Sequence, residues 1–81
     1  MQAKLLVTPY NFLMKDFHKI LKALRDEKEM SQAQLGEALG YKSHSMIAQW
    51  ESGKIFPTIE SLITLADFFR VSIDYLIGRE Q

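Results

Sequence analysis

Apolar residues in the first third of the chain recur at the spacing of an amphipathic helix. They lie side by side or three to four positions apart: Leu13, Phe17, Ile20, Leu21 and Leu24. Lysines lie between them, so one face of the helix is apolar and the other is charged. We expect a helix over residues 10–28, or one that begins near residue 14, because Asn11 is a weak helix former and a possible cap.

Residues 31–53 are predicted to form two short helices separated by a tight turn. Ser31 is a favourable N-cap, and Gln34 follows at the spacing of a capping box. Gly40 stands where the first helix must end, because the residue after a helix often needs a left-handed backbone. Ser43 is the expected cap of the second helix. Helices this short are not stable alone, so the rest of the chain must hold them together.

Each of these two helices has an apolar side. Leu35, Ala38 and Leu39 form the expected inner face of the first helix. Ile47 and Trp50 are three positions apart and form the expected inner face of the second. This spacing favours Trp50 as a core residue over the alternative, a platform on which a base could stack.

The last third of the chain is also predicted to be helical. Thr58 is a favourable cap for a helix over residues 59–69, which is apolar nearly all round and should be buried on more than one side. Ser72 caps a short final helix over residues 73–77, which ends at Gly78. The pattern as a whole predicts an all-α fold of five helices.

The composition is that of one small globular domain, with 81 residues, of which 47% are hydrophobic. Cysteine is absent, which excludes a disulfide framework and fits a reducing, cytoplasmic setting. No apolar run approaches the ~18–20 residues that cross a bilayer. We divide the chain into an N-terminal arm, residues 1–8, and a helical domain, residues 9–81. The arm is either a mobile terminus or, since residues 5–7 are apolar, a docking segment.

The second helix of the central stretch carries the candidate chemistry. A helix fits the major groove of B-DNA and reads base edges there with polar side chains. Polar residues occupy its first turn and outer side: Ser43, His44, Ser45 and Gln49. Glutamine can pair with adenine through two amide hydrogen bonds, and serines and backbone N–H groups suit phosphates. His44 is either a DNA contact or merely exposed.

Charge is distributed in a way that the total conceals. The net charge is zero, which on bulk charge alone argues against a nucleic-acid partner. The charge of the contacting face matters more, however. Lys42 and Lys54 flank the second helix, and Glu51 is the one acidic residue between Lys42 and Thr58. This part of the chain is therefore locally basic.

Residues 17–78 resemble the Cro/phage-repressor type of helix-turn-helix protein, also called the xenobiotic-response-element family. The matching segments are LKALRDEKEMSQAQLGEAL, IAQWESGKIFPTIESLITLADFF and VSIDYL. The resemblance implies a five-helix, lambda-repressor-like DNA-binding domain. Most members of this family are dimeric transcription regulators of prokaryotes and phages, so we expect a cytoplasmic regulator from such a source.

The resemblance also implies roles for individual residues. Gln32 matches a glutamine that contacts a phosphate and supports the reading helix, and Lys54 matches a phosphate-contacting turn. The residues that match base-reading or backbone-contacting positions are Ser43, His44, Ser45 and Gln49. Met46 stands where a small polar residue is common, and it either touches a thymine methyl group or only packs.

The remaining matches concern structure. Arg25 and Glu51 match a charge pair that ties the first helix to the third, and Trp50 matches a core position. Gly36 replaces the usual alanine at a helix crossing and satisfies the need for a small residue at ~1 kcal/mol of helix propensity. One more residue than usual separates Gly40 from Ile47, which lengthens the turn.

We therefore expect a sequence-specific DNA-binding repressor that binds an inverted repeat as a homodimer. The expected dimer surface is the C-terminal helix at Tyr75, Leu76 and Ile77, with help from the N-terminal arm. The alternative is an antitoxin-like or adaptor protein that uses the fold to bind another protein. DNA binding should weaken steeply with salt, whereas binding through an apolar face should not.

Several other classes of function lack the residues they need. The chain has no nucleophile–base pair, no glycine-rich phosphate loop and no carboxylate pair in a pocket-forming context, so we expect no enzymatic activity and no cofactor. His44 has only His18 as a possible histidine partner, so no metal site is expected. His18 itself is expected on the solvated side of its helix. Nothing indicates a small-molecule ligand or a membrane partner.

Overall fold

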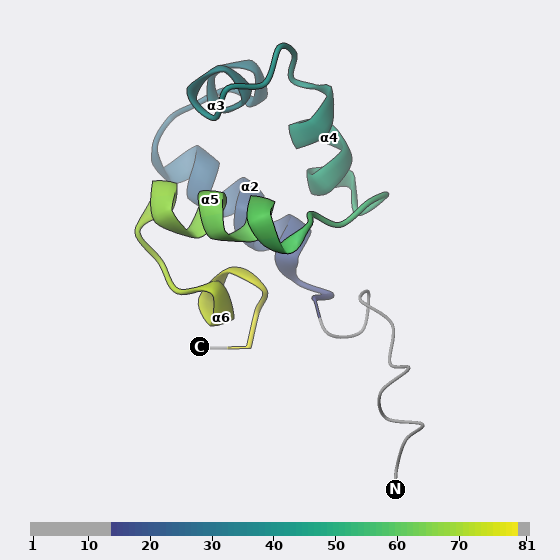
Figure 1. Ribbon diagram of the computed structural model, residues 1–81, viewed down its shortest axis with the longest axis vertical. Coiled ribbons are helices and arrows are strands. Elements are labelled where there is room, and N and C mark those ends of the chain that lie inside the picture. Colours follow the sequence, from purple (N-terminus) through teal and green to yellow (C-terminus); the bar gives the residue numbers. More distant parts are fainter. Residues whose placement is uncertain (1–13, 80–81) are drawn as a thin grey trace, which may run out of the picture.

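A computed structural model of the chain describes residues 14–79. This part contains five α-helices and no strand: α2 (Phe17–Glu27), α3 (Gln32–Ala38), α4 (Ser45–Ser52), α5 (Ile59–Phe69) and α6 (Ile73–Leu76). The expected all-α fold is therefore confirmed. Figure 1 shows α3 and α4 at one end of the molecule, α6 at the other, and α2 crossing α5 between them. The expected N-terminal arm and the first residues of the predicted 10–28 helix lie outside the described residues.

One hydrophobic core joins all five helices. Its fully buried side chains come from every helix: Phe17, Leu21, Leu35, Ile47, Leu65 and Leu76. Because α3 and α4 each contribute at least one of these residues, the two short helices are held in place by burial in this shared core, with α3 packed on α4 and α4 packed on α2. Burial in the core supplies the stability that helices of seven and eight residues lack on their own.

Three of the predicted N-caps are present in the structure, whereas the first described helix begins at Phe17, after a turn at residues 14–16, and not at residue 10 or 14. Ser31 and Gln34 form a complete capping box: Ser31 Oγ accepts from the Gln34 N–H at 3.0 Å, and Gln34 Oε1 accepts from the Ser31 N–H at 2.7 Å. Thr58 caps α5 through the Ser61 N–H, and Ser72 caps α6 through the Tyr75 N–H. These caps act within four residues of sequence, which explains why local spacing predicts them.

Two predictions of burial on the helix faces are wrong. Ala38 is exposed, because α3 turns Leu35 and Gly36 toward the core instead. Ile59 and Ile63 of α5 are 60% and 45% exposed, although the helix is apolar nearly all round. The residues of α5 that meet the core lie on its other side: Leu62, Leu65, Ala66 and Phe69.

Two further residues are more buried than predicted. Leu76 is fully buried inside the chain, so it is not available to a dimer surface on α6. His18 is half-buried, and its ring lies 4.0 Å from the position that a Cβ on Gly53 would occupy. It therefore faces the end of α4 and not only solvent. Within residues 14–79, no helix is both long enough and apolar enough to span a bilayer.

Candidate nucleic-acid interface

The helix that is predicted from the sequence to read DNA begins at Ser45. His44 is its N-cap residue and already has helical backbone angles, and its side chain makes no capping hydrogen bond. Ser43 Oγ instead accepts from the Ser45 N–H at 3.3 Å and lies 3.0 Å from the Ser45 hydroxyl. The prediction that Ser43 is the N-cap is therefore wrong by one residue. The longer turn places Ser43 outside the helix, where its hydroxyl reaches only the first amide.

The outer side of α4 forms a polar surface that we call the reading face. It consists of four exposed residues: Ser45, Met46, Gln49 and Ser52. Behind it, Ile47 is completely buried and Trp50 is 2% exposed, which confirms both as core residues. Apolar anchors on one side and short polar side chains on the other are what a helix needs to be held against a groove.

Ser52 was missed by the sequence analysis. Its hydroxyl donates to the Gln49 carbonyl at 2.9 Å and also lies 3.3 Å from the Lys54 N–H. Ser52 lies seven positions after Ser45, two helical turns along the same side. This spacing is the signal in the sequence that places Ser52 on the same side of the helix as Ser45.

Exposed lysines lie at both ends of α4. Lys42 precedes the helix in the turn, and Lys54 follows Gly53, whose left-handed backbone (φ 82°) ends the helix. The Lys54 N–H donates to the Gln49 carbonyl at 3.2 Å, so the residue is fixed directly after the last turn. Exposed lysines in these positions suit phosphate groups on either side of a groove.

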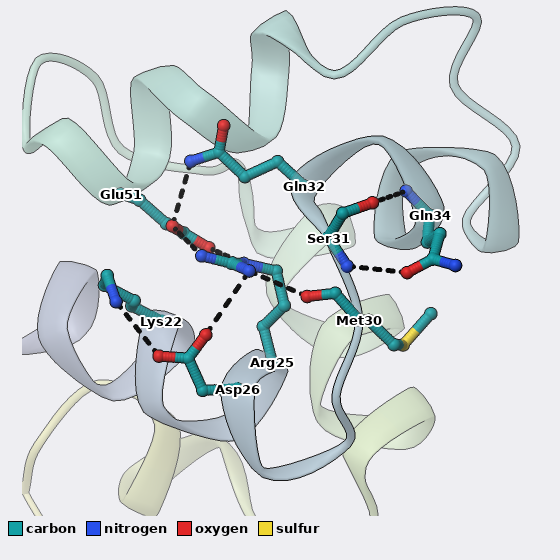
Figure 2. Close-up of polar contacts among 8 residues, drawn as sticks. All are labelled: Lys22, Arg25, Asp26, Met30, Ser31, Gln32, Gln34 and Glu51. Carbon is teal, nitrogen blue, oxygen red and sulfur yellow. Dashed lines mark hydrogen bonds and ion pairs between the residues drawn. The ribbon is translucent and has the colours of Figure 1, made fainter.

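The acidic residue of α4 does not oppose these lysines. Figure 2 shows Glu51 pointing toward Arg25 of α2. Arg25 Nε and Nη2 donate to the two Glu51 carboxylate oxygens at 2.6 and 2.8 Å, and Nη1 donates to the Met30 carbonyl at 2.7 Å. The side chains of this pair are only 10% and 5% exposed. The charge of Glu51 is therefore turned inward and neutralised.

Hydrogen bonding from Arg25 to Glu51 also stabilises the charged form of the arginine. It raises the pKa of Arg25 and outweighs the opposing effect of burial. Arg25 therefore stays charged, and the pair persists as an ion pair between α2 and α4. The structure thus contains the tie between these helices that the family resemblance implied.

Gln32 at the start of α3 extends this network. Its side-chain nitrogen donates to Glu51 Oε1 at 3.0 Å, and Figure 2 shows its amide oxygen pointing away from Glu51. An amide nitrogen carries two protons, so this bond is compatible with the phosphate contact that the resemblance implies. Gln32 therefore links α3 to α4 whether or not it meets DNA.

Gly36 fits its position more tightly than the sequence indicated. A Cβ at this position would lie 2.9 Å from the backbone carbonyl oxygen of Ser43. Real Cβ atoms essentially never approach so closely, so even alanine would force the backbone to move. Glycine therefore meets the need for a small residue at this crossing, and a residue with a Cβ would not fit without a shift of the backbone.

A groove beside the start of α4 has mixed chemistry. It is lined by Ala33, Glu37, Tyr41, Lys42, Ser43 and His44. Glu37 brings a negative charge to the edge of an otherwise basic region. Among residues 14–79, no group of three histidine or acidic residues is arranged to hold a metal ion.

Comparison with known proteins agrees with this geometry. The helix-turn-helix family pattern matches residues 21–76. The chain is 44% identical over 66 residues to the HTH-type transcriptional activator BcrR of Enterococcus faecalis, which covers 82% of this chain and 32% of that protein. It is 41% identical over 49 residues to the cryptic phage CTXphi transcriptional repressor RstR of Vibrio cholerae serotype O1. This match covers 60% of this chain and 43% of that protein.

A solved structure shows the same fold. The SOS-response transcriptional repressor LexA from Eubacterium rectale superposes with a TM-score of 0.75 at 21% identity, over 86% of this chain and 73% of that one. The chain spans about a third of BcrR and less than half of RstR, so their full activities are not transferred with the match. The match over residues 21–76, the all-α fold and the geometry of α3 and α4 establish that the chain belongs to the Cro/phage-repressor type of helix-turn-helix transcription regulators.

Proposed function

We propose that the protein is a sequence-specific DNA-binding transcription regulator that places α4 in the major groove. The observation that carries the proposal is the arrangement of α4, where exposed Ser45 and Gln49 lie opposite the buried anchors Ile47 and Trp50. A helix fixed from behind can present its polar side chains in one orientation, which base recognition requires.

The contacts on DNA divide into two kinds. Gln49 reads a base, with adenine as its natural partner, and Met46 contacts a thymine methyl group or only packs. Lys42 and Lys54 bind phosphates, which adds affinity without sequence preference. The other contacts come from the turn before α4, the first residue of α4 and the start of α3: Ser43, His44, Ser45 and Gln32.

Dimerisation on an inverted repeat is the second part of the proposal. Two copies related by a twofold axis present two α4 helices about 34 Å apart, one turn of DNA. Four of the six large exposed hydrophobic residues in the described chain lie on α5 and α6, which pack on each other: Ile59, Ile63, Ile73 and Tyr75. These residues replace the buried Leu76 as the basis of the proposed dimer surface.

We further propose that the protein acts as a repressor in the cytoplasm of a prokaryote. Of the relatives, BcrR is named as an activator and RstR as a repressor, so the names support both signs of regulation. A small domain that occupies its DNA site can block other proteins there without any additional surface. Repression therefore requires only the DNA-binding surface already described.

Selection of bound sequences from random DNA, followed by a salt titration of the winner, tests this function. We expect a palindromic winner and an affinity that falls steeply as salt rises, because phosphate contacts release counterions. Enrichment of no sequence would contradict the proposal. A single asymmetric site would retain DNA binding but contradict the dimer.

The second candidate is an antitoxin-like or adaptor protein that binds another protein. The exposed isoleucines of α5 and the zero net charge favour it. Its binding would change little with salt, because burial of apolar surface does not release counterions. A protein partner whose affinity is unchanged by salt, together with no sequence preference on DNA, would select this candidate.

A further inference from the structure

The turn between α3 and α4, residues 39–44, is closely tied to the end of α3. The Gly40 N–H donates to the Glu37 carbonyl at 3.0 Å, and the Tyr41 N–H donates to the Gly36 carbonyl at 2.8 Å. Gly40 has a left-handed backbone (φ 91°), which completes a Schellman motif. The position of Tyr41 is therefore determined by α3.

The side chain of Tyr41 reaches the two helices that follow. Its ring meets the Trp50 ring edge to face, with centroids 5.9 Å apart and planes at 80°. Its hydroxyl oxygen lies 3.4 Å from Ser61 Oγ, which in turn lies 3.2 Å from the hydroxyl of Thr58, the N-cap of α5. A single half-buried side chain in the turn thus contacts the core residue of α4 and the first turn of α5.

The second half of the turn lies directly on α3. The Ser43 carbonyl oxygen would be 2.9 Å from a Cβ on Gly36, so it takes this position only because residue 36 has no side chain. Ser45, the first residue of the reading face, follows two positions later. The turn is therefore held by Tyr41 near its middle and by Gly36 near its end, immediately before the residues that would meet DNA.

We propose that Tyr41 is a positioning residue for α4, and that its contacts with Trp50 and Ser61 determine how well the chain discriminates among DNA sequences. Base recognition depends on where the backbone of α4 lies, because the side chains of Ser45 and Gln49 are shorter than those of the lysines and must meet base edges at fixed positions. The flexible lysines at positions 42 and 54 tolerate a shifted helix and still reach phosphates. The inference rests on the proposed DNA-binding function and adds a residue outside the reading face to it.

The test compares affinity for the selected site with affinity for random duplex DNA of the same length. We expect Tyr41→Ala to lower specific affinity at least tenfold and to change non-specific affinity less than twofold. Tyr41→Phe keeps the ring against Trp50 and should retain specific affinity within about threefold. Both measurements are made at a temperature where each variant is folded, as judged by circular dichroism.

Phe68→Ala is the matched control. Phe68 is also a half-buried aromatic residue, but it contacts Phe69 at 5.0 Å and Lys28 at 5.6 Å, not the turn. The Phe68→Ala substitution should lower the melting temperature without changing the ratio of specific to non-specific DNA affinity. An unchanged ratio in Tyr41→Ala, or an equal loss of that ratio in Phe68→Ala, would overturn the proposal.

Amide hydrogen exchange provides a measurement without DNA. In Tyr41→Ala, or in Tyr41→Leu if the alanine variant does not fold, we expect the Ala48 amide, which donates to the His44 carbonyl at 2.9 Å, to exchange at least tenfold faster relative to the core amides. An unchanged relative rate would show that Tyr41 does not hold the turn. If the parent chain prefers no DNA sequence, the proposed function fails, and exchange still decides whether Tyr41 positions α4.

Discussion

At the scale of single residues, the reading face separates two kinds of contact that mutation should distinguish. Gln49 is exposed on the outer side of α4, whereas Lys54 follows the helix in the loop. Gln49→Ala should weaken binding to the selected site by ~1–3 kcal/mol and relax discrimination at one base pair. Competition binding against sites with each base substituted measures both effects.

Lys54→Ala serves as the counterpart. It should lower affinity for all sequences and reduce the salt dependence, because a phosphate contact carries no sequence information. A changed preference among sequences in Lys54→Ala would mean that Lys54 reads a base. Unchanged affinity and specificity in Gln49→Ala would remove that residue from the interface.

Arg70 offers a prediction about stability alone. It follows α5 with a left-handed backbone (φ 60°, ψ 44°), a conformation that costs a residue with a Cβ roughly 1–2 kcal/mol. Part of this is offset by the larger unfolded-state entropy of glycine. Arg70→Gly should therefore raise the free energy of unfolding by ~1 kcal/mol, measured by thermal melting. Arg70→Ala is the control, and a gain there would assign the effect to the side chain and not the backbone.

Sequence alone predicts the structural roles of some residues well, because those roles depend on neighbours in the sequence. The capping box of Ser31 and Gln34 and the left-handed Gly40 depend on neighbours within a few positions. The roles of Gly36 and Tyr41 depend on Ser43, Trp50 and Ser61, which approach only after the helices pack. No spacing rule connects residues 41 and 61, so the sequence could not show this contact.

At the scale of elements, helical periodicity identifies α2 to α6 but not which sides are covered. Ile47 and Trp50 were placed correctly because α4 has only one apolar side. α5 is apolar nearly all round, so its pattern does not distinguish the core-facing Leu62 from the exposed Ile63. The packing of α5 decides between them, and periodicity within one helix contains no information about it.

The ion pair between α2 and α4 supports a prediction at this scale. Arg25→Met leaves the Glu51 carboxylate, 5% exposed, without its bidentate partner. Loss of one member of a buried pair costs ~3–5 kcal/mol because the remaining charge is uncompensated. Glu51→Leu should be similarly destabilising, whereas the double variant should recover much of the loss. Urea denaturation of all four proteins gives the coupling energy.

Strictly additive losses in this cycle would show that Arg25 and Glu51 do not stabilise one another. The exposed pair Lys22–Asp26 on α2 is the comparison, at 2.9 Å with side chains 60% and 54% exposed. Its hydrogen bond lowers the pKa of Asp26, so its contribution is present above the unfolded-state pKa and disappears as the pH falls through the lower folded-state value. Because both of these side chains are exposed to solvent, Lys22→Ala should lower the free energy of unfolding much less than Arg25→Met at neutral pH.

At the scale of the whole molecule, a neutral chain presents two surfaces with different chemistry. The α4 end carries exposed polar residues and a lysine at each end of the helix. Glu51 adds no exposed negative charge there, because it is turned inward toward Arg25. The α5 and α6 helices carry exposed isoleucines and Tyr75. In the proposed dimer, the second surface joins the two copies and both copies of α4 meet one duplex.

This arrangement predicts that a charge on α5 separates the two copies without unfolding either. Ile63 is 45% exposed, so Ile63→Glu should leave the monomer folded, as judged by circular dichroism, while sedimentation equilibrium shows no dimer. Affinity for a single half-site should be retained. Affinity for the full palindrome should fall by a factor of roughly 10²–10⁴, because the second half-site is no longer bound intramolecularly.

The control places the same charge on a different helix. Ala23 is exposed on α2, and Ala23→Glu should leave both the dimer and its affinity for the palindrome unchanged. A dimer that survives Ile63→Glu would exclude α5 from the interface. A parent chain that is monomeric on the full palindrome, with equal affinity for each half-site, would contradict the twofold dimer itself while leaving the reading face of α4 intact.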